Sequence, residues 1–541
     1  MKKSIFILML MVCFIGGFSD AKTTTPPVMG WSSWNTFGIN INENLIRQQA
    51  EAMVKSGLTE AGYKYVNIDD GFWDGRASDG NLILNTKLFP TGMRSLTDYI
   101  HSLGLKAGIY SDAGHNTCAS DKGKHASGRG VGFYGHEERD AKLYFDDWNF
   151  DFIKIDYCGA QTLELDEKEQ YTRIAEAIKK CNNNNISLNI CRWGYPGHWA
   201  SDVADSWRTT GDIYCDWESV RSIINQNLNL QAYTRNGHYN DCDMLEIGRT
   251  LSSEEEKTHM AYWCITSSPL LIGCDLTTLP QKSFSLLTNP HLIAMNQDSL
   301  AIGAPVIQRQ GDVYVVAKDI EKVMGPKRAI VIMNLGDNEE TIDLDLVKAG
   351  FKDSVDVFDC FEGVDFPKCE KSMKITLAPH DSKAYFLMGN RIEKSVYQAE
   401  EGYLGAFYDM CCLENREMPV TGRPQSDSSA DLGFYVEGIG TSVENYLEWD
   451  NIFSSEGGKY QLTFRYASPD PRSMTIDVNG CNIATLDGLS TGHTSQGWKT
   501  VSLEINLNKG INTIRVHNPH SFAPNLDYLS LVKMSDDINP N

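Results

Sequence analysis

The sequence is poor in positive charge and has none of the cysteine and histidine patterns that hold zinc. Its 541 residues contain 49 Lys and Arg against 71 Asp and Glu, which gives a formal net charge of −22. This balance argues against nucleic acid or an anionic membrane surface as a partner. The 12 histidines and 14 cysteines show no CxxC or HExxH spacing, so they do not indicate a zinc site.

Long apolar runs are also scarce, and no membrane span is expected. The one run near the N-terminus, Ile5–Phe18, follows two lysines and precedes Ser19-Asp20-Ala21. It is too short to cross a bilayer, and its flanks predict a signal peptide over residues 1–21. A lipid anchor on Cys13 is the alternative. We therefore expect a secreted or periplasmic protein with the signal peptide removed, in a compartment that permits disulfides.

Eight segments of the first 300 residues run from apolar or aromatic residues into polar or charged ones. They are PVMGWSSW (27–34), YKYVNIDDG (63–71), LKAGIYSD (105–112), FDFIKIDYC (150–158), ISLNICRWG (186–194), SWRTTGD (206–212), YNDCDML (239–245) and PLLIGCD (269–275). Between the first of them, residues 43–58 and 93–103 have the apolar spacing of helices that stop at Gly57 and Gly104. This alternation predicts an α/β fold, a (β/α)8 TIM barrel over residues 22–300.

The carboxyl ends of these predicted strands are rich in carboxylates and aromatic rings. In a TIM barrel these ends form the active site. Carboxylates accept hydrogen bonds from sugar hydroxyls, cations donate to them, and tryptophan stacks on the apolar sugar face. The residues at these ends are Trp34, Asp69, Asp70, Tyr110, Asp112, Lys154, Asp156, Arg192, Trp193, Arg208, Asp212, Asp241 and Asp243.

The segment FDFIKIDYC contains the strongest candidate for a nucleophile. Side chains in a strand repeat every two residues, so Lys154 and Asp156 lie on the same side. A neighbouring cation lowers the pKa of a carboxyl and keeps it ionised, as a nucleophile requires. From this segment alone, a structural Lys–Asp pair at a strand end is the alternative.

The motifs GWSSWNTFG, NIDDGFWDG, GIYSDAG, KIDYC, WRTTGDI, NDCDML and NQD resemble glycoside hydrolase family 27, the retaining α-galactosidases and their relatives. By this resemblance Asp156 is the nucleophile and Asp212 the general acid/base; a helix-capping role is the alternative for Asp212. The resemblance also implies a disulfide between Cys118 and Cys158. It assigns the sugar hydroxyls and pocket walls to Asp69, Asp70, Lys154, Arg208, Trp34 and Tyr110. A solvated turn is the alternative for the Asp69–Asp70 pair.

The chemistry can be stated independently of the family. In a retaining glycosidase the two carboxyl groups stand about 5–5.5 Å apart, one as nucleophile and one as acid. Asp212 has to be protonated in the free enzyme, which the charge of Asp156 and burial would favour. No cofactor is expected for catalysis.

One motif departs from the family pattern. Many α-galactosidases have Cys-Glu-Trp where this chain has Cys191-Arg192-Trp193. We expect Arg192 and Trp193 to be substrate-binding residues, with Arg192 either at the 2-position of the sugar or in a further subsite. The predicted function is release of terminal α-linked galactose from oligo- or polysaccharides. The alternatives are a β-L-arabinopyranosidase, an α-N-acetylgalactosaminidase or a non-catalytic sugar-binding protein.

The remainder of the chain predicts two β-domains. Residues 301–390 have short alternating strands typical of the antiparallel β-domain that follows the barrel in the family, and Cys360 and Cys369 are close enough in sequence to bridge. Residues 389–395 are polar and predict a linker with few contacts.

Residues 395–535 resemble carbohydrate-binding modules of families 6 and 35, which are β-sandwiches of jelly-roll type. The segments that carry this resemblance include YQAEEG, GFYVEGIG, MTIDVNG and NLDYLSL. It implies a structural calcium ion held by Glu400 and Asp527, and a sugar site lined by Tyr435, Trp498 and Asn518. The alternative is that these aromatic residues are core residues of a stabilising domain.

Overall fold

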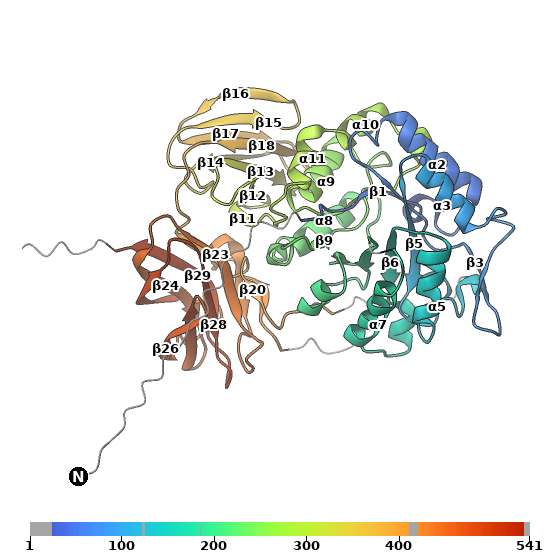
Figure 1. Ribbon diagram of the computed structural model, residues 1–541. Helices are drawn as coiled ribbons and strands as arrows, with labels where there is room; N and C mark the ends of the chain where they lie inside the picture. The colour runs from blue at the N-terminus through green and yellow to red at the C-terminus, as the bar shows by residue number, and fades with distance from the viewer. Residues whose placement is uncertain (1–23, 122–124, 184, 411–419, 535–541) are drawn as a thin grey trace, which may run out of the picture.

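The structure is a computed structural model that describes residues 24–121, 125–183, 185–410 and 420–534 (Figure 1). The predicted signal peptide lies outside these residues. Eight strands form one parallel sheet in the order β10-β1-β2-β5-β6-β7-β8-β9. A parallel bridge between Leu245 and Ile272 joins the loop after β9 to β10 and closes the sheet. The (β/α)8 barrel predicted from the sequence is therefore confirmed.

Each barrel strand lies within one of the eight predicted segments. The strands are β1 (Met29–Ser32), β2 (Tyr65–Asn67), β5 (Lys106–Asp112), β6 (Phe152–Asp156), β7 (Ser187–Ile190), β8 (Ser206–Arg208), β9 (Tyr239–Asp241) and β10 (Leu270–Ile272). A separate hairpin, β3 (Trp73–Arg76) and β4 (Leu82–Leu84), extends from the loop after β2.

Helices surround the barrel (Figure 1). The longer ones are α2 (Glu43–Ser56), α3 (Met93–Ser102), α7 (Glu167–Lys179), α8 (Trp217–Asn227) and α9 (Ser253–Ile265); the shorter ones are α1 (Trp34–Phe37), α4 (Cys118–Asp121), α5 (Glu137–Ala141), α6 (Cys158–Thr162), α10 (Gln281–Leu287) and α11 (Pro290–Asn296). In α2 the Asn42 side chain caps the first turn, and Gly57 ends the helix with a φ of 93°. This conformation favours glycine, as the sequence pattern indicated.

The second domain is antiparallel and packs on α9. Its strands are β11 (Val306–Gln310), β12 (Val313–Asp319), β13 (Lys327–Asn334), β14 (Glu340–Asp345), β15 (Val355–Asp359), β16 (Val364–Cys369), β17 (Ser372–Leu377) and β18 (Ser382–Met388). Six of them form one sheet, and β14 pairs with β17. Lys257 of α9 forms an ion pair of 2.5 Å with Asp381. Cys360 and Cys369 are both reduced, so the bridge between them is not formed: Cys360 is buried and Cys369 donates to the Ser372 carbonyl.

The C-terminal domain consists of two antiparallel sheets. One contains β19 (Val396–Gln398), β21 (Arg423–Ser426), β22 (Phe434–Glu437), β24 (Gly458–Ala467), β27 (Lys499–Leu507) and β29 (Asn525–Lys533). The other contains β20 (Tyr403–Leu404), β23 (Leu447–Ser454), β25 (Arg472–Val478), β26 (Cys481–Leu489) and β28 (Gly510–His517). The buried side chains of Trp449, Leu462, Phe464, Ile476 and Val516 belong to its core.

Residues 389–395, between the two β-domains, were predicted to be a linker with few contacts. Two of their side chains instead form hydrogen bonds and ion pairs with residues of the flanking domains. Arg391 donates to Asp319 at 2.9 Å, and Lys394 forms an ion pair with Glu401. The C-terminal domain also contacts the barrel, because Arg235 forms an ion pair of 2.6 Å with Asp450. The three domains are therefore in contact with one another.

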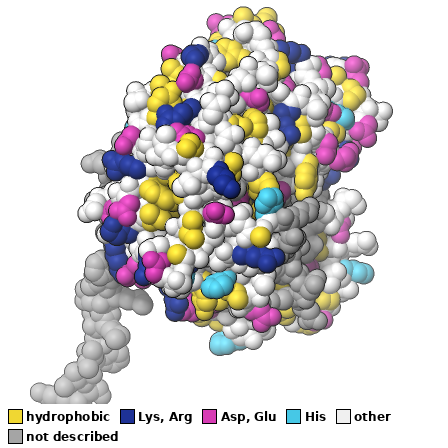
Figure 2. Space-filling model, turned by 90° about the vertical axis from the view of Figure 1, so that its right-hand side faces the viewer, with side chains coloured by type: hydrophobic (Ala, Val, Ile, Leu, Met, Phe, Trp, Pro, Cys, Tyr) yellow, Lys and Arg dark blue, Asp and Glu magenta, His cyan; other side chains and the backbone are white. Residues whose placement is uncertain are grey.

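The surface shows no single patch of one charge on the face in Figure 2, where acidic, basic and apolar side chains are interspersed. Among the described residues, no helix is both long and apolar enough to cross a membrane.

Candidate active site

The nucleophile candidate Asp156 is the last residue of β6, between β5 and β7 in the barrel sheet. Its register partner on β5 is Asp112, and Lys154 lies opposite Tyr110. Asp156 is only 5% exposed. Its Oδ1 is buried and has no hydrogen-bond partner within the described part of the chain. One carboxylate oxygen at the carboxyl end of the barrel is thus buried without a hydrogen bond from the described residues.

Several groups shift the pKa of Asp156. Burial raises the pKa of this carboxyl, the charge of Lys154 opposes the rise, and a hydrogen bond from the Cys191 thiol also opposes it. The net direction is upward, so the prediction of a lowered pKa is wrong, because burial outweighs the cation. Lys154 donates to Asp69 at 3.3 Å. Burial would lower the pKa of Lys154, but the charges of Asp69 and Asp156 raise it well above its usual value.

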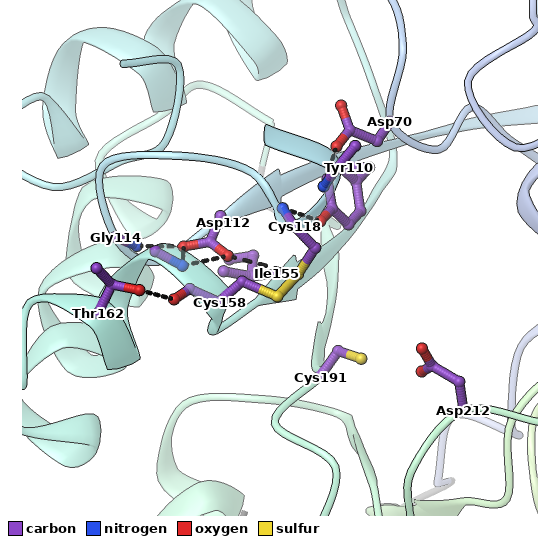
Figure 3. The surroundings of a disulfide bond; sticks show 12 residues. Asp70, Tyr110, Asp112, Gly114, Cys118, Ile155, Cys158, Thr162, Cys191 and Asp212 are labelled. Atoms are coloured by element: carbon purple, nitrogen blue, oxygen red, sulfur yellow. Dashed lines mark hydrogen bonds between the residues drawn. A yellow bond between two sulfur atoms is a disulfide. The ribbon is translucent and has the colours of Figure 1, made fainter. Parts of the chain in front are cut away.

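Asp212 follows β8 and is reached by the buried side chain of Arg208. Its carboxylate lies 3.3 Å from the Arg208 guanidinium and is 51% exposed, so the burial expected for it is not found. In Figure 3 the carboxylate of Asp212 and the sulfur of Cys191 point toward one another. The charge of Asp212 contributes to the raised pKa of both Cys191 and Asp156.

Arg208 is held by a second carboxylate. It forms an ion pair of 2.7 Å with the buried Asp243. Burial raises the pKa of Asp243 to about 7, against the charge of Arg208. Asp243 has a φ of 78°, and Trp193 after β7 has a φ of 62°. Such left-handed conformations in non-glycine residues are costly and are typical of functional sites.

A small cavity of about 20 Å³ lies among these strand ends. Its polar lining comes from Asn67, Asp69, Lys154, Asn189, Arg208, Asp241 and Asp243. Asn189 donates to Asp241 at 2.8 Å, so Asp241 is an internal hydrogen-bond partner. This volume has room for about one water molecule.

The Asp69–Asp70 pair lies at the end of β2 and is buried, so it is not a solvated turn. The backbone amide of Asp70 donates to Asp69, and that of Gly71 donates to Asp70. Burial raises the pKa of Asp70 to about 6, and the charge of Asp69 adds to the rise. Tyr110 of β5 is buried and Trp34 of α1 is partly buried.

The predicted disulfide between Cys118 and Cys158 is present and connects α4 to α6 (Figure 3). The Cys118 amide donates to the Tyr110 hydroxyl at 3.4 Å. Asp112 lies beside the disulfide and accepts from the amides of Gly114 and Gly159, so it supports these loops. Burial raises the pKa of Asp112 well above its usual value.

Arg192 does not take the role predicted for it. Its guanidinium forms an ion pair of 2.7 Å with Glu167 of α7 and donates to the Asp409 carbonyl of the C-terminal domain at 2.6 Å. The side chain is 1% exposed. Because its polar atoms are directed to protein partners, we correct the assignment of Arg192 to sugar binding. Trp193 is buried next to it.

Sequence reasoning did not single out Cys191 as a functional residue. Its amide donates to the Ile155 carbonyl at 2.8 Å, its thiol opposes the rise in the pKa of Asp156, and Arg208 lies 3.7 Å from its sulfur. Its position directly after β7 was the available signal, because that is where active-site residues lie in a barrel.

A family model described as alpha galactosidase A matches residues 25–298. The chain belongs to this family. Alpha-galactosidase 2 of Arabidopsis thaliana is 40% identical over 367 residues, which are 67% of this chain and 89% of the relative. Alpha-galactosidase A of Cellvibrio japonicus is 40% identical over 331 residues, covering 59% and 77% of the two chains.

Solved structures agree with this membership. Alpha-galactosidase I from Mortierella vinacea superposes with a TM-score of 0.63 at 28% identity, covering 70% of this chain and 100% of the other. A putative α-galactosidase/melibiase from Bacteroides fragilis superposes with a TM-score of 0.61 at 34% identity, covering 67% and 79%. The protein is accordingly a glycoside hydrolase of the α-galactosidase type.

Because Asp70 is buried, we expect it to lower the stability of the fold at neutral pH while it supports activity. Its pKa rises from 3.8 to about 6 on folding, so the native state holds a proton that the unfolded chain has released between these pH values. The free energy of unfolding therefore falls as pH rises through this window, and the penalty persists at higher pH. We expect Asp70→Asn to raise this free energy by about 1–3 kcal/mol at pH 7.5, with no gain near pH 4, while galactosidase activity falls.

The measurement is urea unfolding of both proteins at the two pH values. Asp74→Asn is the matched control, since Asp74 is exposed and carries no burial penalty. An Asp70→Asn protein that is less stable than the wild type at pH 7.5 would contradict the prediction.

Proposed function

We propose that this α-galactosidase releases terminal galactose with retention of configuration, using Asp156 as nucleophile and Asp212 as general acid/base. Two observations carry the proposal: the buried Oδ1 of Asp156 has no hydrogen-bond partner among the described residues, and the half-exposed carboxyl of Asp212 contributes by its charge to the raised pKa of Asp156. A nucleophile needs a free oxygen. An acid that later activates water needs access to solvent, which Asp212 has.

The reaction proceeds in two displacements. The Asp156 carboxylate attacks the anomeric carbon and forms a glycosyl ester while the bond to the leaving oxygen breaks. Asp212 gives its proton to that oxygen. In the second step Asp212 takes a proton from water, the water oxygen attacks the anomeric carbon, and Asp156 leaves as a carboxylate. The side chains of Cys191 and Tyr110 oppose the rise in the pKa of Asp156 that burial causes, which favours its charged form in the free enzyme and as it leaves.

The residues that we assign to sugar binding lie at the carboxyl ends of the barrel strands. We assign Asp69, Asp70 and Lys154 to the hydroxyl groups of galactose, with Trp34 and Tyr110 as walls of the pocket. Lys154 bonds Asp69 and lies 5.4 Å from the centre of the Tyr110 ring, so these groups surround one space. The presence of Asp70 favours galactose over a pentopyranose, because the latter has no 6-hydroxyl. Arg208 lies near the sugar but is bonded mainly to Asp243.

Removal of the nucleophile tests the first assignment. Asp156→Ala should lower the hydrolysis of 4-nitrophenyl α-galactoside by several orders of magnitude while the cooperative thermal transition is retained. Azide should restore turnover, since it enters the vacated space and attacks the anomeric carbon to give a β-galactosyl azide. A near-native rate in the Asp156→Ala protein would rule out this residue as the nucleophile.

The acid can be separated from the nucleophile by the leaving group. Asp212→Ala should damage hydrolysis of raffinose-type galactosides far more than that of nitrophenyl galactosides, because a good leaving group needs little protonation. The check is the ratio of kcat/KM values for the two substrates in the variant and the wild type. Equal losses on both would show that Asp212 is not the acid.

We also propose that the C-terminal domain binds carbohydrate through Trp498. This ring is half-buried, packs edge-on against Tyr435 at 5.6 Å and has the Arg465 guanidinium 5.3 Å from its centre. Its indole N–H donates to Ser429. Tyr435 is itself buried, and Asn518 is bonded to Ser473 and Ser521, so these two support the loops. Trp498 is thus the aromatic residue left to stack on a sugar.

Trp498→Ala should weaken retention of the full-length protein on insoluble galactose-substituted polysaccharide and leave rates on nitrophenyl galactoside within about twofold. Sedimentation with the polysaccharide and kinetics on the small substrate measure the two effects. Unchanged retention would assign Trp498 to the core.

A calcium site in this domain is supported by two buried oxygen atoms that receive no hydrogen bond from the described residues. Glu400 Oε2 and Gln398 Oε1 are buried without hydrogen-bond partners among the residues that the structure describes. Burial raises the pKa of Glu400 well above its usual value, and the charges of Glu401 and Asp527 add to this rise. Oxygen donors of this kind suit calcium. Asp527 already pairs with Arg465, so Glu400 is the main candidate ligand and Asp527 a neighbouring one.

If calcium binds there, a chelator should lower the thermal unfolding temperature of the wild-type protein, and added calcium should restore it. Glu400→Gln should remove this response. A calcium response that survives in Glu400→Gln would place the ion elsewhere.

We also propose that the protein is exported. This proposal is based on the N-terminal sequence, which has the features of a signal peptide.

A further inference from the structure

The C-terminal domain reaches the loop that follows β7, at the catalytic end of the barrel. Tyr195 of this loop stacks on Phe407 with ring centres 5.8 Å apart and planes at 11°. Tyr233 lies 4.1 Å from Tyr195 and 5.6 Å from Phe407, which completes a cluster of buried rings. The amide of Asp409 donates to the Tyr195 carbonyl at 2.9 Å. Residues 403–410, here called the docking arm, are therefore seated on this loop.

Arg192 ties the docking arm to the barrel with a buried charge. Its Nε and Nη2 each lie 2.7 Å from one oxygen of Glu167, the first residue of α7. Its Nη1 donates to the Asp409 carbonyl at 2.6 Å. A bidentate arginine–carboxylate pair fixes orientation as well as position. One side chain thus joins the end of β7, the start of α7 and the docking arm.

The approach of the two backbones leaves little room for a side chain at position 194. A Cβ added to Gly194 would lie 3.0 Å from the Met410 carbonyl oxygen, 3.1 Å from Asp409 Cβ and 3.2 Å from Arg192 Nη1. An alanine at this position would therefore shift the docking arm or the Arg192 guanidinium by a few tenths of an ångström.

The residues on either side of Arg192 lie at the carboxyl end of β7, beside the strand of the nucleophile. The Cys191 amide donates at 2.8 Å to the carbonyl of Ile155, the residue before Asp156, and the Cys191 sulfur lies 3.7 Å from Arg208. Trp193 is buried in a left-handed conformation, which persists only where the surroundings enforce it.

We propose that the docking arm is a positioning element of the active site: through Arg192 it holds Cys191 and Trp193, and with them the orientation of the nucleophile. This inference rests on the role proposed above for Asp156. It makes the C-terminal domain part of the catalytic unit, in addition to any role in binding polysaccharide. Arg192 is called a positioning residue because its guanidinium binds Glu167 and the Asp409 carbonyl.

A second contact between the same two domains provides a control. Arg235 and Asp450 form an ion pair on the loop before β9, where the Arg235 guanidinium also lies 5.0 Å from the centre of the Tyr403 ring. Both side chains are about one-third exposed, so the pair adds little stability. Asp450→Asn therefore removes one contact between the two domains and leaves Arg192, Gly194 and Phe407 unchanged.

The test uses full-length variants and steady-state kinetics on 4-nitrophenyl α-galactoside. Phe407→Ala, Gly194→Ala and Arg192→Met should each lower kcat, on the order of 10- to 100-fold for Arg192→Met, because small displacements of a reacting group are costly. KM should change by less than about threefold, since Asp69, Asp70 and Lys154 are untouched. Arg192→Lys should recover part of kcat, as lysine keeps the charge and loses the bidentate geometry.

Asp450→Asn should retain the wild-type kcat. Thermal unfolding identifies any variant that fails to fold, and Gly194→Ala changes one methyl group only. Wild-type kcat in folded Phe407→Ala and Gly194→Ala proteins would overturn the proposal. An equal loss of kcat in Asp450→Asn would also overturn it, because general domain contact would then be the cause. The Asp156→Ala experiment fails or succeeds independently of these variants.

Discussion

Two buried cations, Lys154 and Arg208, are the electrostatic condition on which this active site depends. The ends of neighbouring strands bring Asp69, Asp156, Asp212 and Asp243 into one region, and like charges at such distances raise one another's pKa. Lys154 lies between Asp69 and Asp156, whereas Arg208 lies between Asp212 and Asp243. Without these cations, several buried carboxylates would have to take up protons. With them, one carboxylate oxygen of Asp156 has no hydrogen-bond partner in the described part of the chain.

The two carboxylates proposed for catalysis differ mainly in their surroundings. Asp156 is buried at the end of a central strand, whereas Asp212 lies in the following loop region and is half-exposed. This difference suits their roles, because a nucleophile benefits from a dry site and an acid/base has to exchange protons with water. The barrel produces the difference through its geometry: β6 ends inside the ring of strands, and the chain after β8 turns outward.

The contact between the C-terminal domain and the loop after β7 also restrains the active site. The C-terminal domain contacts the barrel in two places, through the Arg192–Asp409 contact after β7 and the Arg235–Asp450 pair before β9. The first contact is buried and adjoins catalytic residues, whereas the second is partly exposed. A chain with separate binding and catalytic domains joined by a free linker would not need the first contact. Its presence indicates that the domain supports the loop after β7.

Much of this architecture could be read from the sequence, because the relevant signals are local. The transition from apolar to polar residues marks each barrel strand, Gly57 and Gly104 mark helix ends, and the KIDYC and WRTTGD motifs mark Asp156 and Asp212. Tertiary structure alone decided the rest. The pKa of Asp156 shifts upward because burial outweighs the charge of Lys154, and burial is a property of the whole fold. Arg192 bonds a carbonyl 217 residues away, a partner that no local pattern of side chains can identify.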